Sequence, residues 1–107
     1  MQWSVEALDA AMAELEALPP GLKGRMLRLF DLVTTYGVTA LHEPHARQID
    51  GKLWELRAKA REGIARGLYV AVSGQRVVVL HIFEKKAQKT PQRAIDLARA
   101  RMKEIKP

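Results

Sequence analysis

The chain has no cysteine among its 107 residues, which excludes structural disulfides and thiolate metal sites and fits a reducing compartment. It also has no apolar run long enough to cross a bilayer, and no basic segment followed by an apolar stretch near its N-terminus. With 48% hydrophobic and 28% charged residues, the composition is that of a folded domain. We therefore expect one domain over residues 1–107, in the cytoplasm and with no membrane partner.

Several catalytic motifs are absent as well. The sequence contains no glycine-rich loop of the P-loop type and no Gly-x-Ser-x-Gly elbow. Carboxylates after Asp50 are few and scattered, so a two-metal nuclease would lack ligands. His42 and His45 are three residues apart, but no second cluster completes a metal site, and we interpret them as surface histidines. The sequence predicts neither a metal ion nor a cofactor.

Charge is distributed unevenly along the chain. Residues 1–50 contain four Lys or Arg and seven Asp or Glu, a net charge of −3. Residues 51–107 contain fourteen Lys or Arg and five Asp or Glu, a net charge of +9. This asymmetry favours a polyanionic partner, either nucleic acid or an acidic protein segment, although a solvated basic surface explains the charge equally well.

Apolar residues recur at helical spacing in the first third of the chain. Ser4 is a candidate N-cap for a first helix, and Pro19-Pro20-Gly21 ends its apolar stripe. A second stripe follows, with Gly37 as its C-terminal signal. We expect two helices in an antiparallel hairpin, followed by an irregular connector over residues 38–50. The two stripes comprise Val5, Leu8, Met12, Leu15, Leu18, then Leu22, Met26, Leu29, Phe30, Val33.

Downstream of the connector the apolar pattern takes the period of a strand. Over residues 53–59, alternation places Trp54 and Leu56 on the face that packs against the helices. It sends Glu55, Arg57 and Lys59 outward on the other face.

Two further strands are predicted over residues 64–72 and 77–83, joined by a turn at Ser73-Gly74. The second of these is apolar on both faces, which is typical of a central strand covered on both sides. A last helix begins with Thr90 as N-cap and Pro91 as first helical residue.

Arg66 is the most conspicuous residue of this region. It stands in an otherwise apolar strand, where a charged group costs free energy unless it is paired or opens onto a polar groove. Two interpretations remain open. Arg66 either forms a salt bridge with Glu55 or Glu62, or binds phosphate together with Arg57 of the preceding strand.

Lys85, Lys86 and Lys89 lie between the last strand and the last helix. Three ammonium groups within five residues repel one another, and phosphates that displace counterions relieve this repulsion. The N-terminus of the following helix adds partial positive charge. The segment is therefore either a phosphate site or a solvated basic loop.

Metal-independent RNA cleavage requires a group that accepts the 2′-OH proton, one that stabilises the phosphorane and one that protonates the leaving 5′-oxygen. Arginine suits the second task because its planar fork donates two parallel hydrogen bonds. Lysine suits the first task if burial or neighbouring cations lower its pKa, as the neighbours of Lys85 would do. His81 is a second candidate for proton transfer, or else a histidine satisfied between strands.

Four segments together resemble the RelE/ParE toxin superfamily, in particular its HigB-like, phage-derived branch. They are residues 51–57 (GKLWELR), 64–69, 77–83 and 83–91 (FEKKAQKTP). The resemblance implies an α+β fold in which two N-terminal helices pack on a small twisted antiparallel sheet, with a C-terminal helix. It also implies a toxin of a type II toxin–antitoxin pair that cleaves mRNA on the ribosome. The implied partner is a cognate antitoxin of the helix-turn-helix kind.

In this interpretation the catalytic candidates are Arg57, Arg66, Lys85 and His81. The candidate phosphate-binding residues are Lys59, Lys86, Lys89 and Arg93. The chain has no tyrosine after the third predicted strand, so a mechanism that uses a C-terminal tyrosine is excluded.

Two alternative functions stay open. One is a toxin of the same fold that inhibits DNA gyrase, like the ParE group. The other is an RNA-binding module without catalysis, which would need exposed aromatic side chains that this sequence supplies sparsely.

Overall fold

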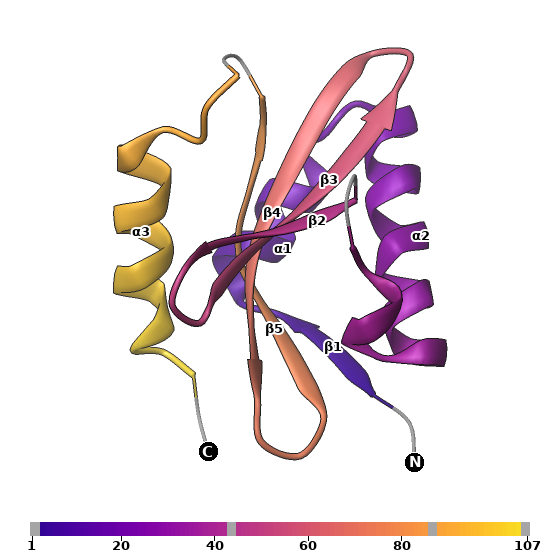
Figure 1. The fold of residues 1–107 in the computed structure, drawn as a ribbon. Helices are drawn as coiled ribbons and strands as arrows, with labels where there is room; N and C mark the ends of the chain where they lie inside the picture. Colours follow the sequence, from indigo (N-terminus) through magenta and orange to yellow (C-terminus); the bar gives the residue numbers. More distant parts are fainter. Residues whose placement is uncertain (1–2, 43–44, 86–87, 106–107) are drawn as a thin grey trace.

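The computed structural model describes residues 3–42, 45–85 and 88–105. Its centre is a five-stranded sheet with the strand order β1-β5-β4-β3-β2 (Figure 1). β1 runs parallel to β5, and every other pair of neighbours is antiparallel. The strands are β1 (Ser4–Ala7), β2 (Ala46–Asp50), β3 (Leu53–Ala60), β4 (Gly63–Val72) and β5 (Arg76–Glu84).

Helices cover both faces of this sheet. α1 (Asp9–Glu16) and α2 (Pro20–Tyr36) pack on one face, and α3 (Gln92–Met102) lies on the opposite side (Figure 1). A single 3₁₀ turn, Val38–Ala40, follows α2. The α+β fold predicted from the sequence, with two N-terminal helices and one C-terminal helix on a small sheet, is confirmed.

Each face of the sheet has its own apolar core. The first core lies between α1, α2 and the sheet, and includes Leu15, Met26, Leu56 and Val79. The second lies under α3 and comprises Leu53, Leu68, Val70, Val78, Leu80, Ala94 and Ala98. Because side chains alternate between the two faces along β3 and β4, each of these strands contributes residues to both cores.

The end of α2 lies where the sequence predicts it. Gly37 has φ +84°, a conformation that residues with a side chain rarely adopt. A Cβ at this position would also lie 2.6 Å from Nε1 of Trp3. Glycine is required here on both grounds.

The N-terminal residues differ from the prediction. Ser4 is not a helix N-cap, because residues Ser4–Ala7 form β1, and α1 begins only at Asp9. β1 pairs with β5 from Ser4 opposite Arg76 to Ala7 opposite Val79. The helical spacing of apolar residues was satisfied by a strand followed by a helix, since hydrogen bonds from the edge of β5 outweigh local helix propensity.

The connector predicted over residues 38–50 is only partly irregular. Ala46–Asp50 is β2, the edge strand beside β3, and its register shifts between Gln48 and Asp50. This segment is polar and lacks the alternation of a half-buried strand, so only its pairing with β3 identifies it. The residues before it, 43–44, lie outside the described part of the chain.

Within the described residues, no helix combines the length and the hydropathy that a membrane crossing requires.

Candidate functional site

Two arginines face each other across the centre of the sheet. Arg57 of β3 lies directly opposite Arg66 of β4, and both belong to the face that α3 covers. Side chains paired in this way have Cβ atoms about 4.5–5.5 Å apart. Two cations so close raise each other's energy unless an anion lies between them.

That anion is Glu55, whose side chain is fully buried. The prediction that Glu55 faces outward was right about the sheet face and wrong about exposure, since α3 and the segment before it cover this face. Arg66 Nη1 lies 3.3 Å from Glu55 Oε2, and Arg57 Nε lies 3.6 Å from Glu55 Oε1. One carboxylate thus serves two guanidinium groups.

Arg66 is also bound to the segment that leads into α3. Its Nη1 donates to Thr90 Oγ1 at 2.5 Å, and its Nη2 donates to the Gln88 carbonyl at 2.6 Å. The Thr90 hydroxyl in turn donates to Glu55. We call Glu55, Arg66 and Thr90 the buried cluster. Thr90 was predicted as a helix N-cap, but α3 begins at Gln92, and the Thr90 hydroxyl serves the cluster instead.

The structure distinguishes between the two interpretations of Arg66. Its side chain is 0% exposed, and its carboxylate partner is Glu55. Glu62 instead accepts a hydrogen bond from the Gly21 amide at 2.9 Å. Desolvation, opposed by Glu55 and reinforced by Arg57, lowers the pKa of Arg66, although an arginine remains charged near neutral pH. Arg66 cannot reach a ligand in solution without a rearrangement of its cover.

Arg57 differs from its neighbour in being open to solvent. Its side chain is 27% exposed, and its guanidinium forms an ion pair with Glu55. Its Nε is buried without a hydrogen-bond acceptor in that part of the chain. Of the two arginines, Arg57 is therefore the one that an anion in solution can approach.

Lys85 follows β5 directly, and its amide donates to the Ile64 carbonyl at 2.7 Å. The pKa of its ammonium lies below the ordinary value, first through desolvation and then through the positive charges of Arg66 and Arg57. Lys85 thus belongs electrostatically to the same group as the two arginines. In Figure 1 the end of β5 and the β3–β4 hairpin lie at the same end of the molecule.

Arg47 is a member of this group that the sequence did not reveal. It lies on β2 opposite Glu55, is exposed, and its charge lowers the pKa of both Arg66 and Lys85. Sequence reasoning missed it because it placed Arg47 in an irregular connector, where no sheet face could be assigned. We call Arg47, Arg57 and Lys85 the cationic patch.

The remaining phosphate-binding candidates lie around this patch or beyond it. Lys59, Lys89 and Arg93 are exposed. Lys86 lies outside the described residues. Arg93 lines a hollow of about 420 Å³ between β5 and α3, together with His81, Phe83, Glu84 and Leu97.

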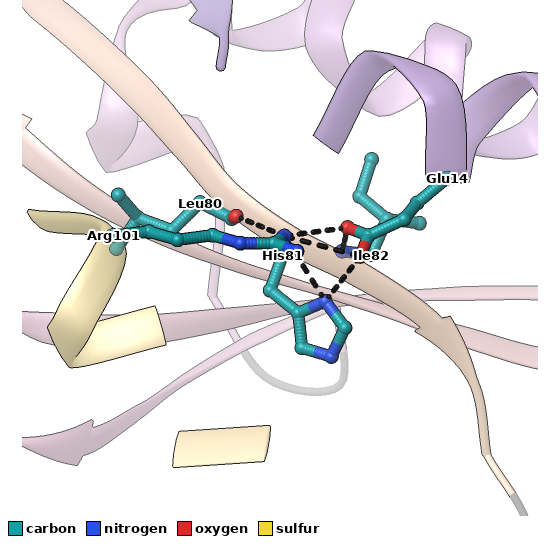
Figure 2. A network of polar contacts seen from close by, with 5 residues as sticks. All are labelled: Glu14, Leu80, His81, Ile82 and Arg101. Atoms are coloured by element: carbon teal, nitrogen blue, oxygen red, sulfur yellow. Dashed lines mark hydrogen bonds and ion pairs between the residues drawn. The ribbon is translucent and has the colours of Figure 1, made fainter. Parts of the chain in front are cut away.

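His81 belongs to a different constellation, at the edge of β5. Its Nδ1 lies 3.0 Å from Glu14 Oε2, and its ring stacks on Phe83 with centroids 4.9 Å apart. Figure 2 shows Glu14 approaching from α1 and Arg101 from α3. We call Glu14, His81 and Arg101 the edge network.

The edge network covers backbone groups that β1 leaves open, since β1 ends opposite Val79. The Ile82 amide donates to Glu14 Oε1 at 3.0 Å, and Arg101 Nη1 donates to the Leu80 carbonyl at 2.9 Å. Burial raises the pKa of Glu14, but hydrogen bonds from Arg101, Ile82 and His81 outweigh it, so the pKa lies below its ordinary value. The arrangement matches the interpretation of His81 as a histidine satisfied within the sheet.

Strand spacing separates the backbone of His81 from that of Arg57. His81 is on β5 opposite Leu68, two strands away from Arg57 and two residues along. This amounts to about 10 Å across the sheet and about 7 Å along it. In the described part of the chain, no group of three or more His, Asp or Glu side chains is placed to hold a metal ion.

The fold of this chain is similar to that of two solved RelE structures. A mutant of the Escherichia coli toxin RelE in the free state superposes with a TM-score of 0.62 at 15% identity, covering 90% of this chain and 97% of RelE. The RelE of the archaeal RelE–RelB complex from Pyrococcus horikoshii OT3 superposes with a TM-score of 0.58 at 20% identity, covering 83% and 100% respectively.

The sequence identifies the family. The model of the family described as Phage derived protein Gp49-like (DUF891) matches residues 13–103, and the chain belongs to this family. No curated protein matches the chain significantly. The resemblance to the RelE/ParE toxin superfamily is confirmed.

Proposed function

We propose that this protein is the toxin of a type II toxin–antitoxin pair and that it cleaves mRNA on the ribosome without a metal ion. The Gp49-like family and the fold shared with two RelE proteins support the toxin assignment. A ribosomal substrate places the proposed activity in the cytoplasm. The net charge of +9 in residues 51–107 supports a polyanionic substrate.

The cationic patch is the observation that carries this proposal. Arg57 is partly exposed and Arg47 is exposed, and they lie on neighbouring strands. The positive charges of both lower the pKa of Lys85. Groups that stabilise a phosphorane must already be in place before charge develops on it. The pairing of β2 with β3 fixes the backbone positions of both arginines before a substrate binds.

In the proposed reaction the ribose 2′-oxygen attacks the adjacent phosphorus, the bond from phosphorus to the 5′-oxygen breaks, and a water molecule protonates the leaving 5′-oxygen. The products are a 2′,3′-cyclic phosphate and a 5′-hydroxyl end. Arg57 donates hydrogen bonds to the phosphorane oxygens. Lys85 accepts the 2′-OH proton, because its lowered pKa increases the neutral fraction of its amine. His81 has no part in this step, since its Nδ1 is bound to Glu14.

The exposed lysines extend the patch for binding. Lys59 and Lys89 would contact phosphates that flank the scissile one, and Arg93 would contact a phosphate near the hollow that it lines. Such contacts strengthen binding without selecting a sequence. We also propose Lys86 for this role by its place in the basic segment.

Cleavage of mRNA on programmed ribosomes, with mapping of the new RNA ends, tests the proposal. The wild-type protein is expected to produce cuts at defined codon positions. Arg57→Gln is expected to lower the cleavage rate about 100-fold, because one preorganised donor to the phosphorane is lost.

Arg28→Gln is the matched control, because Arg28 is exposed on α2, on the opposite side of the sheet. It is expected to cleave like the wild type. No codon-positioned cuts by the wild-type protein would overturn the proposed activity. Inhibition of DNA supercoiling in a gyrase assay would then support the ParE-like alternative.

The proposed partner is a cognate antitoxin of the helix-turn-helix kind. The Pyrococcus horikoshii RelE was solved in complex with RelB, which supports an antitoxin partner for this chain. Induced expression should arrest growth, and co-expression of a helix-turn-helix protein encoded by a neighbouring gene should relieve the arrest. Arrest that such a neighbour does not relieve would contradict this pairing.

A further inference from the structure

The two carboxylate oxygens of Glu55 have different partners. Oε2 lies 3.3 Å from Arg66 Nη1 and accepts a hydrogen bond from the Thr90 hydroxyl. Oε1 lies 3.6 Å from Arg57 Nε. The Glu55 side chain is fully buried, and a carboxylate is planar, so the contacts that fix Oε2 also limit where Oε1 can lie.

The Arg57 side chain is divided between the interior and the solvent. It is 27% exposed, yet its Nε is buried, so the exposure belongs to other atoms of the side chain. Glu55 and Arg57 are two residues apart on β3, and their side chains leave the same face of the sheet. Glu55 therefore meets the guanidinium of Arg57 from the interior, whereas an anion in solution approaches it from outside.

The contact between Glu55 and Arg57 is an ion pair without a hydrogen bond. Oε1 and Nε are both buried, and neither has a hydrogen-bond partner among the described residues. Buried groups of this kind call for an explanation other than packing. A movement of about 0.5 Å would turn the contact into a hydrogen bond. Hydrogen bonds of catalytic groups are often long in a free enzyme and tighten when the substrate binds.

Stability alone explains this arrangement poorly, because replacing a buried ion pair by apolar residues is often neutral or stabilising. Order at Arg57 explains it better. An arginine has several rotatable bonds, and fixing them costs entropy. To stabilise a phosphorane, the guanidinium must be ordered before charge develops. A buried carboxylate at Nε supplies this order and leaves the exposed atoms free for the substrate.

We propose that Glu55 is a positioning residue for Arg57. Arg66 and Thr90 hold Oε2 of Glu55, and Oε1 holds Nε of Arg57, so that the exposed part of the guanidinium meets the substrate phosphate. Glu55 itself does not contact the substrate. The catalytic meaning of this role rests on the proposed function, whereas the order of Arg57 is a property of the free protein.

NMR of the arginine Nε–H groups in ¹⁵N-labelled protein tests the positioning. Arg57→Lys and Arg28→Gln assign the resonances of the two arginines that are compared. In the wild type, the Nε–H of Arg57 should exchange with water about 10-fold more slowly than that of the exposed Arg28, because Nε of Arg57 is buried beside a carboxylate.

Glu55→Gln keeps the shape of the side chain and removes its charge. The new carbonyl oxygen is drawn to the donors of Arg66 and Thr90, which turns the NH₂ donor towards Nε of Arg57. Arg57 should then lose its order, and its Nε–H should exchange as fast as that of Arg28. The cleavage rate kcat should fall about 10- to 100-fold with little change in KM.

Glu62→Gln is the matched control, because Glu62 is exposed and binds the Gly21 amide of α2. It should leave both the exchange of Arg57 and the cleavage rate unchanged. If Glu55→Gln does not fold, the double variant Glu55→Leu with Arg66→Met removes both charges of the buried pair and keeps Arg57. There too, the Nε–H of Arg57 should exchange as fast as that of Arg28.

The outcomes separate the two proposals. Glu55 does not position Arg57 if the Nε–H of Arg57 exchanges as fast as that of Arg28 in the wild type, or stays slow in the Glu55 variants. Faster exchange at an unchanged kcat would overturn the catalytic part of the role. A wild-type protein that cleaves no RNA would overturn the proposed function, while the exchange rates would still decide the positioning. Faster exchange together with a reduced kcat supports both proposals.

Discussion

Two glutamate–arginine pairs connect α3 to the rest of the molecule. One binds the residues just before the helix, and the other includes Arg101 near the end of the helix. In the buried cluster, Glu55 and Arg66 are both 0% exposed. In the edge network, Glu14 is 25% and Arg101 15% exposed. The first pair lies within a sheet face and the second at a sheet edge. In the first pair, Arg66 binds Gln88 and Thr90, which precede α3. In the second pair, Glu14 and Arg101 bind backbone groups of β5 that β1 does not pair.

A third pair extends the comparison to the surface. Arg99 of α3 binds Asp50 at the end of β2, and their side chains are 45% and 64% exposed. Water competes more strongly with an ion pair as exposure increases, and the pair contributes less. The three pairs therefore form a series in which the cost of losing one partner should decrease from Arg66 to Arg101 to Arg99.

The largest effect is expected at the buried cluster. Arg66→Met removes the buried partner of Glu55 and leaves it with the partly exposed Arg57 and the Thr90 hydroxyl, and should lower the free energy of unfolding by about 3–5 kcal/mol. The double variant Glu55→Leu with Arg66→Met should recover most of this loss, because both fully buried charges are removed together and Arg57 is partly exposed. Urea unfolding at neutral pH, followed by circular dichroism, measures both variants. A free energy of unfolding for Arg66→Met within about 1 kcal/mol of the wild type would contradict the prediction that the buried cluster has the largest effect.

An intermediate effect is expected at the edge network. Glu14→Gln should lower the free energy of unfolding by about 1.5–3 kcal/mol at neutral pH, because charged hydrogen bonds to Arg101 and Ile82 are lost. The folded pKa of Glu14 is lowered, so its contribution is complete above the unfolded pKa and disappears as the pH falls through the folded pKa.

The two proteins should accordingly begin to converge in stability below about pH 4.3, the ordinary pKa of a glutamate, and become equal below the folded pKa of Glu14. Glu16→Gln is the matched control on α1, because Glu16 is exposed and pairs with Lys23 at the surface. It should change stability by less than about 0.5 kcal/mol. A constant difference between Glu14→Gln and the wild type across the acid range would contradict the assigned role of the Glu14 carboxylate.

The smallest effect is expected at the surface. Arg99→Gln should change the free energy of unfolding by about 0.5 kcal/mol or less, since both charges remain hydrated when separated. At 1 M salt, where the screening length is about 3 Å, the difference should vanish. A large effect of Arg99→Gln, independent of salt, would show that exposure does not order the three pairs.

The strands around the candidate site could be predicted from the sequence because their signals are local. The alternation over residues 53–59 assigned Leu56 to the helical face correctly, and Ser73-Gly74 marked the hairpin between β4 and β5. The prediction failed at Ser4, where a strand followed by a helix reproduces helical spacing. Pairing with a distant strand has no signature in the segment itself.

The candidate site was predictable in its residue types more than in their roles. Arg66 was noticed because a charge in an apolar strand is costly, but its partner depends on the register of β3 against β4. Arg47 was missed because β2 has no local strand signal. Thr90 was assigned to a helix end, whereas the packed structure gives its hydroxyl to Glu55 and Arg66.

The amino-acid sequence alone determined the two apolar stripes, the three central strands and the concentration of positive charge after Asp50, because each depends on neighbouring residues. Only the tertiary structure decided which charges are buried and which are open. Arg57 and Arg66 are paired on neighbouring strands, yet one remains partly exposed and the other is enclosed by Thr90 and Gln88. Burial depends on what the remote segments cover, and that is settled only when the chain folds.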